Sequence, residues 1–113
     1  MTKQELIDSC AVLPDVDEIY TSGQWTVARH SENKKGFAFI FEREGKLCVN
    51  LKCDPSEADL LRQSFDGVLP GYSMSKTHWN TVMVDSDVPE DELCRRIQAS
   101  YDLIKPKVRR VKI

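Results

Sequence analysis

The sequence has no apolar stretch long enough to cross a membrane and no uninterrupted apolar run near its start. A membrane-spanning helix needs about 20 mostly apolar residues. Glu5 and Asp8 stand where a secretory signal would need its apolar run. We therefore expect a cytoplasmic protein with no membrane partner.

Cysteine is present, but not in the spacing of a disulfide framework or a metal site. The four cysteines form no CxxC pair and lie in segments with helix or strand periodicity, and they are Cys10, Cys48, Cys53 and Cys94. Cys48 and Cys53 are five residues apart on one expected strand, so they point to opposite faces and cannot share a metal ion without distortion. We interpret all four as reduced thiols that fill the core.

The sequence also lacks the usual patterns of catalysis and cofactor binding. His30 and His78 are the two histidines, and neither has a carboxylate at ligand spacing. No glycine-rich phosphate loop is present. The acids between residues 85 and 92 suit the positive N-terminus of a helix, and the alternative is a divalent-ion site. We expect a non-enzymatic protein with no cofactor and no metal.

Positive charge is scarce outside the last nine residues. The net charge is −2, but residues 105–113, KPKVRRVKI, hold five cations and no acid. Residues 1–104 then carry eleven Lys and Arg against eighteen Asp and Glu, a net charge of −7. Because nonspecific DNA affinity comes mostly from phosphate neutralisation, binding of nucleic acid requires a local basic patch or this tail.

Periodicity and turn chemistry predict a single α+β domain over residues 1–104, followed by a basic tail at 105–113. The Thr2–Glu5 capping box, the Asp54-Pro55 start signal and Pro89 each begin a helix, and Gly67 suits a left-handed residue after the second helix. The predicted order is α-β-β-β-α-β-β-α, a two-layer fold with helices on one face of an antiparallel sheet of about five strands. The predicted helices cover about 3–12, 54–65 and 89–104, and the strands 24–31, 37–43, 46–53, 68–74 and 77–85.

Two stretches carry a resemblance to a known family: VNLKCDPSEADLLRQSFDGVLPGYSMSKTHWNTVMVD at 49–85 and CRRIQASYDLIKPK at 94–107. With KGFAF at 35–39, they resemble the MmcQ/YjbR family of small bacterial proteins. The resemblance implies an α+β fold with an antiparallel sheet. Members are commonly labelled DNA-binding from their likeness to a "double wing" arrangement, and they have no well-established reaction. Ser73 and Ser75 depart from the family pattern, which often has His and Asn there.

Strand alternation predicts one sheet face that no helix covers. If Val49, Leu51, Val82 and Val84 face the helices, the opposite face bears Asn50, Lys52, Trp79 and Met83. An indole beside a cation is suited to stacking a base and holding its phosphate. The alternative is that Trp79 anchors the sheet beneath the 66–76 loop or a dimer partner.

The connection into the last strand carries Tyr72, Lys76 and His78. Lys76 and His78 alternate with Thr77, and a phosphate or carboxylate bridging them is one interpretation. The other is structural: His78 bonds a backbone carbonyl, and Tyr72 packs at the edge of the core.

The tail cations Lys107, Arg109 and Arg110 alternate with apolar residues. They suit contact with a nucleic-acid backbone or an acidic partner. The alternative is that the tail folds back as an edge strand whose charges discourage aggregation.

The leading hypothesis is a protein that binds DNA or another anionic partner through a surface of Lys52, Tyr72, Lys76, His78 and Trp79, together with the tail. The alternatives are a protein-interaction module or homodimer that uses the exposed sheet face, and a small-ligand binder or enzyme with a cleft at Tyr72 and His78.

Overall fold

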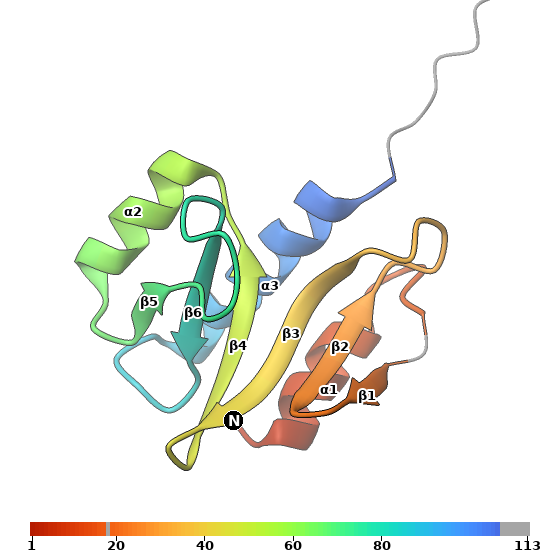
Figure 1. The fold of residues 1–113 in the computed structure, drawn as a ribbon, viewed down its shortest axis with the longest axis horizontal. Helices are drawn as coiled ribbons and strands as arrows, with labels where there is room; N and C mark the ends of the chain where they lie inside the picture. The colour runs from red at the N-terminus through yellow and green to blue at the C-terminus, as the bar shows by residue number, and fades with distance from the viewer. Residues whose placement is uncertain (18, 107–113) are drawn as a thin grey trace, which may run out of the picture.

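Three helices pack on one face of a six-stranded antiparallel sheet with strand order β1-β2-β3-β4-β6-β5 (Figure 1). The computed structural model describes residues 1–17 and 19–106. The two-layer α+β fold is confirmed, and the sheet gains a short edge strand, β1, that periodicity did not reveal. The elements are α1 (Lys3–Ala11), β1 (Tyr20–Ser22), β2 (Trp25–Arg29), β3 (Gly36–Arg43), β4 (Lys46–Lys52), α2 (Pro55–Ser64), β5 (Val68–Pro70), β6 (Trp79–Met83) and α3 (Glu90–Ile104).

The helix starts follow the local chemistry of the sequence. The Thr2 amide donates to the Glu5 carboxylate at 2.9 Å, and the Glu5 amide donates to the Thr2 hydroxyl at 3.1 Å, which completes the predicted capping box. Asp54 accepts from the Ser56 amide at the start of α2. The prediction for Gly67 was wrong, because its φ is not positive. Glycine is needed there because a Cβ atom would collide with the Ser86 side chain.

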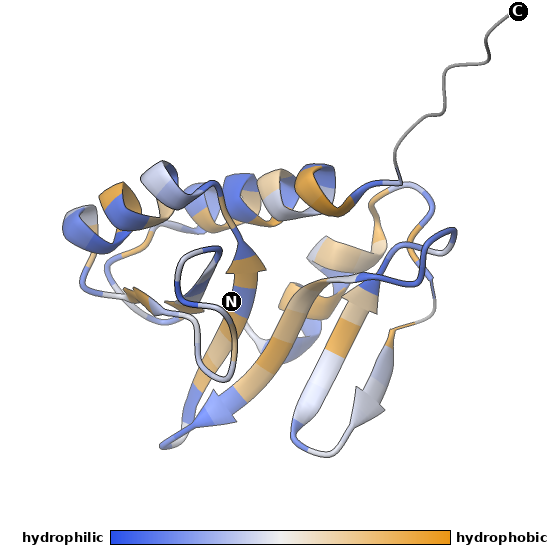
Figure 2. Ribbon diagram, turned by 45° about the horizontal axis from the view of Figure 1, so that its top comes forward, coloured by the Kyte–Doolittle hydropathy of each residue, from blue (hydrophilic) through white to orange (hydrophobic). Residues whose placement is uncertain are grey.

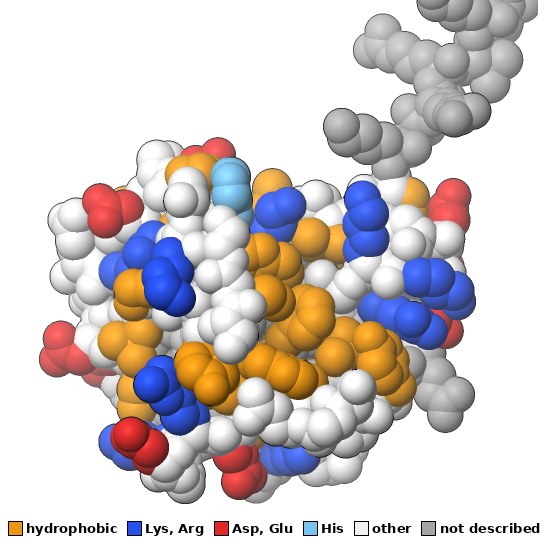
Figure 3. Space-filling view, in the orientation of Figure 1, with side chains coloured by type: hydrophobic (Ala, Val, Ile, Leu, Met, Phe, Trp, Pro, Cys, Tyr) orange, Lys and Arg blue, Asp and Glu red, His pale blue; other side chains and the backbone are white. Residues whose placement is uncertain are grey.

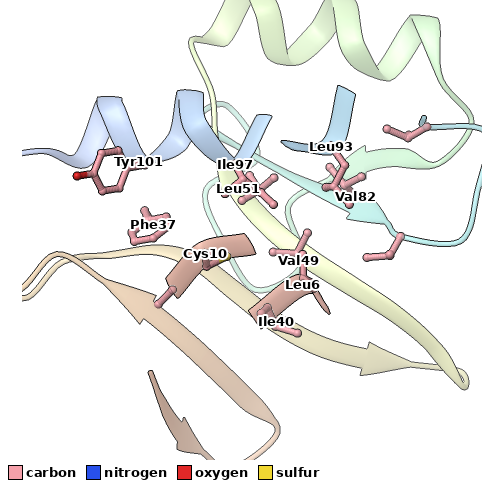
Figure 4. Close-up of a cluster of buried hydrophobic side chains, with 14 of the residues drawn as sticks. Leu6, Cys10, Phe37, Ile40, Val49, Leu51, Val82, Leu93, Ile97 and Tyr101 are labelled. Carbon is pink, nitrogen blue, oxygen red and sulfur yellow. The ribbon is translucent and has the colours of Figure 1, made fainter. Parts of the chain in front are cut away.

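The core lies between the helices and one face of the sheet. Aliphatic side chains of β3, β4 and β6 meet side chains of α1 and α3 (Figure 4). Each of these large apolar side chains contributes roughly 1.5–3 kcal/mol on full burial. The best-buried members of this layer are Leu6, Ile40, Val49, Leu51, Val82, Leu93 and Ile97.

A register shift between Ala28 and Arg29 in β2 changes which way β3 presents its first residues. Gly36 lies near Phe39 and Val27 on the face away from the helices, because a Cβ at Gly36 would meet both side chains. Phe37 instead belongs to the core, where its ring lies 5.3 Å from the ring of Tyr101 (Figure 4). The irregularity thus adds an aromatic ring to the helix layer.

Polar groups beneath the helices are paired with backbone atoms of other elements. His30, 2% exposed, donates from Nε2 to the Tyr101 carbonyl at 2.8 Å. The Tyr101 hydroxyl donates to the Pro14 carbonyl, and the Ser100 hydroxyl donates to the Phe37 carbonyl at 2.6 Å. These bonds join the end of α3 to β2, β3 and the segment after α1.

Along α3, polar and apolar residues are interspersed as in an amphipathic helix, whereas β3 is apolar over most of its length (Figure 2). Within residues 1–17 and 19–106, no helix combines the length and apolar character needed to span a bilayer.

Candidate functional site

The sheet face opposite the helices holds the predicted pair of Lys52 and Trp79. These residues are direct partners in the register of β4 and β6, so their side chains share one face, and both are half-buried. Asn50 also lies on this face, but the prediction of an open position was wrong, because Asn50 is fully buried. The loop between β5 and β6 covers it.

Every Lys and Arg in the six strands lies on this helix-free face. Directly paired residues share a face, and the faces alternate along each strand, which places Arg29, Arg43, Lys46 and Lys52 here. Glu42 is the one acidic residue in the six strands of the described chain, and it lies on the helix side, where it is paired with Leu47. The charged strand residues on this face are therefore all cations, although residues 1–104 have a net charge of −7.

Aromatic rings extend across the same face. The Trp25 ring lies 4.8 Å from Phe41 and 6.4 Å from Phe39, and Phe39 meets the Trp79 ring edge-on at 5.6 Å. The Tyr72 ring stacks on Phe41 at 5.3 Å. Trp25, Phe39, Tyr72 and Trp79 are half-buried. In Figure 3 an apolar strip crosses the centre of this face, with Lys and Arg side chains on both sides of it.

A buried polar network holds the β5–β6 loop against the sheet. The Asn50 side-chain amide donates to the Tyr72 carbonyl at 2.8 Å, and the Tyr72 amide donates to the Thr81 hydroxyl at 2.9 Å. The Thr81 hydroxyl in turn donates to Asn50 Oδ1. Both backbone groups of Tyr72 are thus fixed by side chains that are nearly inaccessible to solvent. This network positions the Tyr72 ring over Phe41.

The structural interpretation of Tyr72 from the sequence, packing at the edge of the core, agrees with this geometry. Its ring also lies beneath a cation, since the Arg43 guanidinium sits 4.7 Å from the ring centroid. Ser73, the next residue, has a φ of 59°, which turns the chain sharply after Tyr72.

Lys76 and His78 are both exposed, but they point toward different neighbours. The Lys76 ammonium donates to the Gly71 carbonyl at 2.9 Å within the loop. His78 lies near α2: the Cys53 amide donates to its carbonyl at 2.8 Å, and its ring is close enough to affect Asp54. The pKa of Asp54 is lowered, first by hydrogen bonds from Ser56 and to a smaller extent by His78. Tyr72 and His78 thus lie at opposite ends of the loop.

Two hollows flank the aromatic rings. The first, of about 310 Å³, lies between the β1–β2 hairpin, β3 and the loop, and Trp25, Phe39 and Met74 contribute to its wall. The second, of about 380 Å³, is lined by Arg43 and Lys46 together with Glu44, and otherwise mostly by apolar side chains. The Tyr72 ring lies near one residue of each hollow, 6.1 Å from the Trp25 ring and 4.7 Å from the Arg43 guanidinium.

The cysteines differ in exposure. Cys10, Cys48 and Cys53 are buried as predicted, whereas Cys94 is exposed on α3, so its interpretation as a core residue was wrong. Burial raises the pKa of Cys10 to about 12, which leaves it a thiol at neutral pH. Among the described residues, no three His, Cys, Asp or Glu side chains gather in a way that would hold a metal ion.

Some residues of the face were not predicted from the sequence, and some predicted residues lie outside the described part of the chain. Trp25, Phe39 and Arg43 belong to the face, and the two-residue period of β2 and β3 contained the signal for them. The predicted tail residues Lys107, Arg109 and Arg110 lie outside the described residues.

Comparison with known proteins gives consistent matches along most of the chain. The model of the family described as YjbR matches residues 11–103. "Uncharacterized protein YjbR" of Escherichia coli K12 is 32% identical over 101 residues, which cover 89% of this chain and 85% of that protein. "Uncharacterized protein YyaQ" of Bacillus subtilis is 34% identical over 87 residues, covering 68% of this chain and 73% of that protein.

Solved structures share the fold. A crystal structure of a Pseudomonas syringae protein, PsR293, superposes with a TM-score of 0.79 at 25% identity, covering 93% of this chain and all of that one. Deinococcus radiodurans DR2400, described as a DUF419 domain, gives a TM-score of 0.80 at 29% identity, covering 91% of this chain and 78% of that one.

Proposed function

The chain belongs to the YjbR family, and we propose that it binds nucleic acid through the helix-free face of its sheet. The observation that carries the proposal is the sorting of charge within the strands. Arg29, Arg43, Lys46 and Lys52 share this face, and Glu42 is turned away from it. A polyanion gains from such a local patch even where the rest of the body is acidic.

The cations differ in how far they are already neutralised. Arg29 forms an ion pair with Asp17 at 2.9 Å, and Lys34 shares the same carboxylate. Arg43 is placed over the Tyr72 ring, and within residues 1–17 and 19–106 it forms no ion pair. Arg43, Lys46 and Lys52 are therefore the strand residues that we expect to contact phosphates.

The aromatic rings supply the second component of nucleic-acid binding. Proteins that bind single strands combine a basic groove with aromatic side chains on which bases stack, worth about 1–3 kcal/mol per base. Trp25, Phe39 and Trp79 are half-buried, so part of each side chain remains accessible. The face therefore offers contacts to both the bases and the phosphates of one strand.

A titration of labelled single- and double-stranded DNA at two salt concentrations tests the proposal. Lys52→Gln and Arg43→Gln should weaken binding and each lower the slope of log affinity against log salt by about 1. Arg95→Gln is the matched control, because it removes the same charge from α3, where Arg95 pairs with Glu92 and Asp91. Equal losses in all three variants, or no binding at low salt, would reject the proposal.

The tail is tested by removing residues 107–113 from the chain. These residues hold four of the five tail cations. If the tail contacts phosphates, the shortened protein loses salt-dependent affinity beyond the loss seen in Lys52→Gln. If the affinity of the shortened protein equals that of the parent, the sheet face alone binds the DNA.

A protein partner or a second copy of the chain is the second candidate function. Two apolar side chains on the helix-free face are well exposed, Tyr20 at 40% and Leu69 at 41%. Sedimentation at several concentrations tests self-association. A dimer that is disrupted by Leu69→Ser would favour this candidate over nucleic acid.

A further inference from the structure

We infer that the apolar hollow beside Tyr72 receives one unpaired base, so that the protein binds single-stranded nucleic acid in preference to duplex. The inference rests on the proposed function and deepens it, because it assigns separate places to base and phosphate. It concerns the first hollow, which lies between the β1–β2 hairpin and the β5–β6 loop.

The hollow is built from aromatic and sulfur-containing side chains of three separate segments. Tyr20 and Trp25 contribute from the hairpin, Phe39 from β3 and Met74 from the loop. Its volume of about 310 Å³ lies at the lower end of the range for ligand pockets, roughly 300–1,000 Å³. Such a wall suits a flat ring, since every base has a π-face that stacks on aromatic side chains.

Polar groups at the rim suit the edge of a base and its backbone. Ser22 and Ser73 also border the hollow, and each hydroxyl both donates and accepts a hydrogen bond.

The second hollow is the expected place of a neighbouring phosphate, because two cations, Arg43 and Lys46, line it against one acid, Glu44. The Trp25 and Tyr72 rings lie 6.1 Å apart, and the Arg43 guanidinium lies 4.7 Å from the Tyr72 ring centroid. A strand crossing Tyr72 would thus place a base against Trp25 and a phosphate near Arg43, a span comparable with one or two nucleotides.

Base pairing would prevent a base from stacking in the hollow. In a duplex the π-faces are stacked within the helix, and the bases offer only their edges in the grooves. The β5–β6 loop forms one wall of the hollow and is held by Asn50 and Thr81. We expect this wall to keep a stacked base pair away from the Trp25 ring and to admit an unpaired base.

Tryptophan fluorescence tests the inference, because the chain has two tryptophans and Trp79→Phe leaves Trp25 as the one reporter. Three probes of equal length are compared in that variant: oligodeoxythymidylate, an abasic oligonucleotide with the same phosphates, and a duplex. We expect oligodeoxythymidylate to quench Trp25 and to bind more tightly than the other two. The abasic probe should bind through its phosphates without quenching.

Substitutions in the hollow give a second readout. Trp25→Leu should weaken oligodeoxythymidylate binding by about 5- to 150-fold, the loss expected for one stacked base, and leave abasic binding unchanged. Tyr20→Ala is the variant to use if Trp25→Leu fails to fold, because Tyr20 is 40% exposed on the edge strand.

The outcomes separate this inference from the proposed function. If the abasic probe or the duplex binds as tightly as oligodeoxythymidylate, with Trp25 unquenched, the inference is overturned and phosphate binding by the face stands. If no probe binds, both are overturned. A Trp25 signal that changes with protein concentration alone would assign the hollow to a second copy of the chain and would also overturn the inference.

Discussion

The two faces of the sheet are covered in different ways. On one face, aliphatic side chains of three strands pack against helices, and the layer is sealed. On the other, aromatic rings and two buried polar side chains are covered in part by a single loop, held through the backbone of Tyr72. The first arrangement maximises apolar burial, whereas the second leaves ring surface and cations available to a ligand.

The largest effect is expected from a cavity in the sealed face. Leu93→Ala should lower the free energy of unfolding by about 2–5 kcal/mol, because Leu93 is 2% exposed and its neighbours cannot fully close the space. Urea denaturation measures this change. Leu103→Ala on the same helix is the control, since Leu103 is 50% exposed and should lose less than about 0.5 kcal/mol. Similar losses would mean that α3 is not packed as described.

A smaller but more informative effect is expected from the network beneath the loop. Thr81→Val keeps the side-chain shape but removes the hydroxyl that accepts from the Tyr72 amide, so the free energy of unfolding should fall by about 1–3 kcal/mol. Amide hydrogen exchange should accelerate between residues 71 and 78. Thr77→Val, at an exposed position of the same loop, provides the comparison. Unchanged exchange in Thr81→Val would show that the network does not hold the loop.

Substitutions that enlarge a side chain test how well each face of the sheet accommodates added atoms. A Cβ at Gly36 meets the end of the Phe39 ring, which borders the hollow and has space to turn, so Gly36→Ala should cost roughly 1 kcal/mol and change Trp25 fluorescence. Ala38→Val adds its carbons to a fully buried position of β3 and should cost up to about 3 kcal/mol. A larger loss of stability in Gly36→Ala than in Ala38→Val would contradict the conclusion that the helix-free face is the less tightly packed one.

The smallest effect concerns the connections at the edge of the helix layer. The Asp66 and Gly67 amides each donate to the Asp87 carboxylate at 2.8 Å, and these bonds lower the pKa of Asp87. A lowered pKa in the folded state adds stability above the ordinary Asp value of 3.8, and that stability is lost as pH falls through the folded-state pKa. Asp87→Asn should therefore flatten the acid side of the stability profile, measured by urea denaturation at several pH values. A profile parallel to that of the parent would contradict this assignment.

The elements and their order were predictable from local signals. The capping box at Thr2, the Asp54-Pro55 start and the alternation in β3, β4 and β6 each act over a few residues, so the chain reveals them directly. β1 was not predictable, because three exposed residues show no apolar period. Its pairing with β2 is imposed by the hairpin at Gly23, which has a φ of 60°.

The site was predicted in part. Lys52 and Trp79 share a face because both strands alternate, and their pairing followed once β4 and β6 were neighbours. Asn50 was misplaced, because alternation gives the side on which a residue lies but not what covers that side. Lys76 and His78 were expected to point the same way, yet the loop directs them to Gly71 and to the region of Asp54.

The family, the α+β class and the charge imbalance between the body and the tail follow from the amino-acid sequence alone, because motifs, periodicity and composition are local or additive properties. The gathering of the strand cations on the helix-free face, and the two hollows on either side of the β5–β6 loop, became evident only from the fold. Both depend on which strands are neighbours and on hydrogen bonds between residues 9 to 31 positions apart in the chain. Such contacts form only when the strands of the sheet have paired.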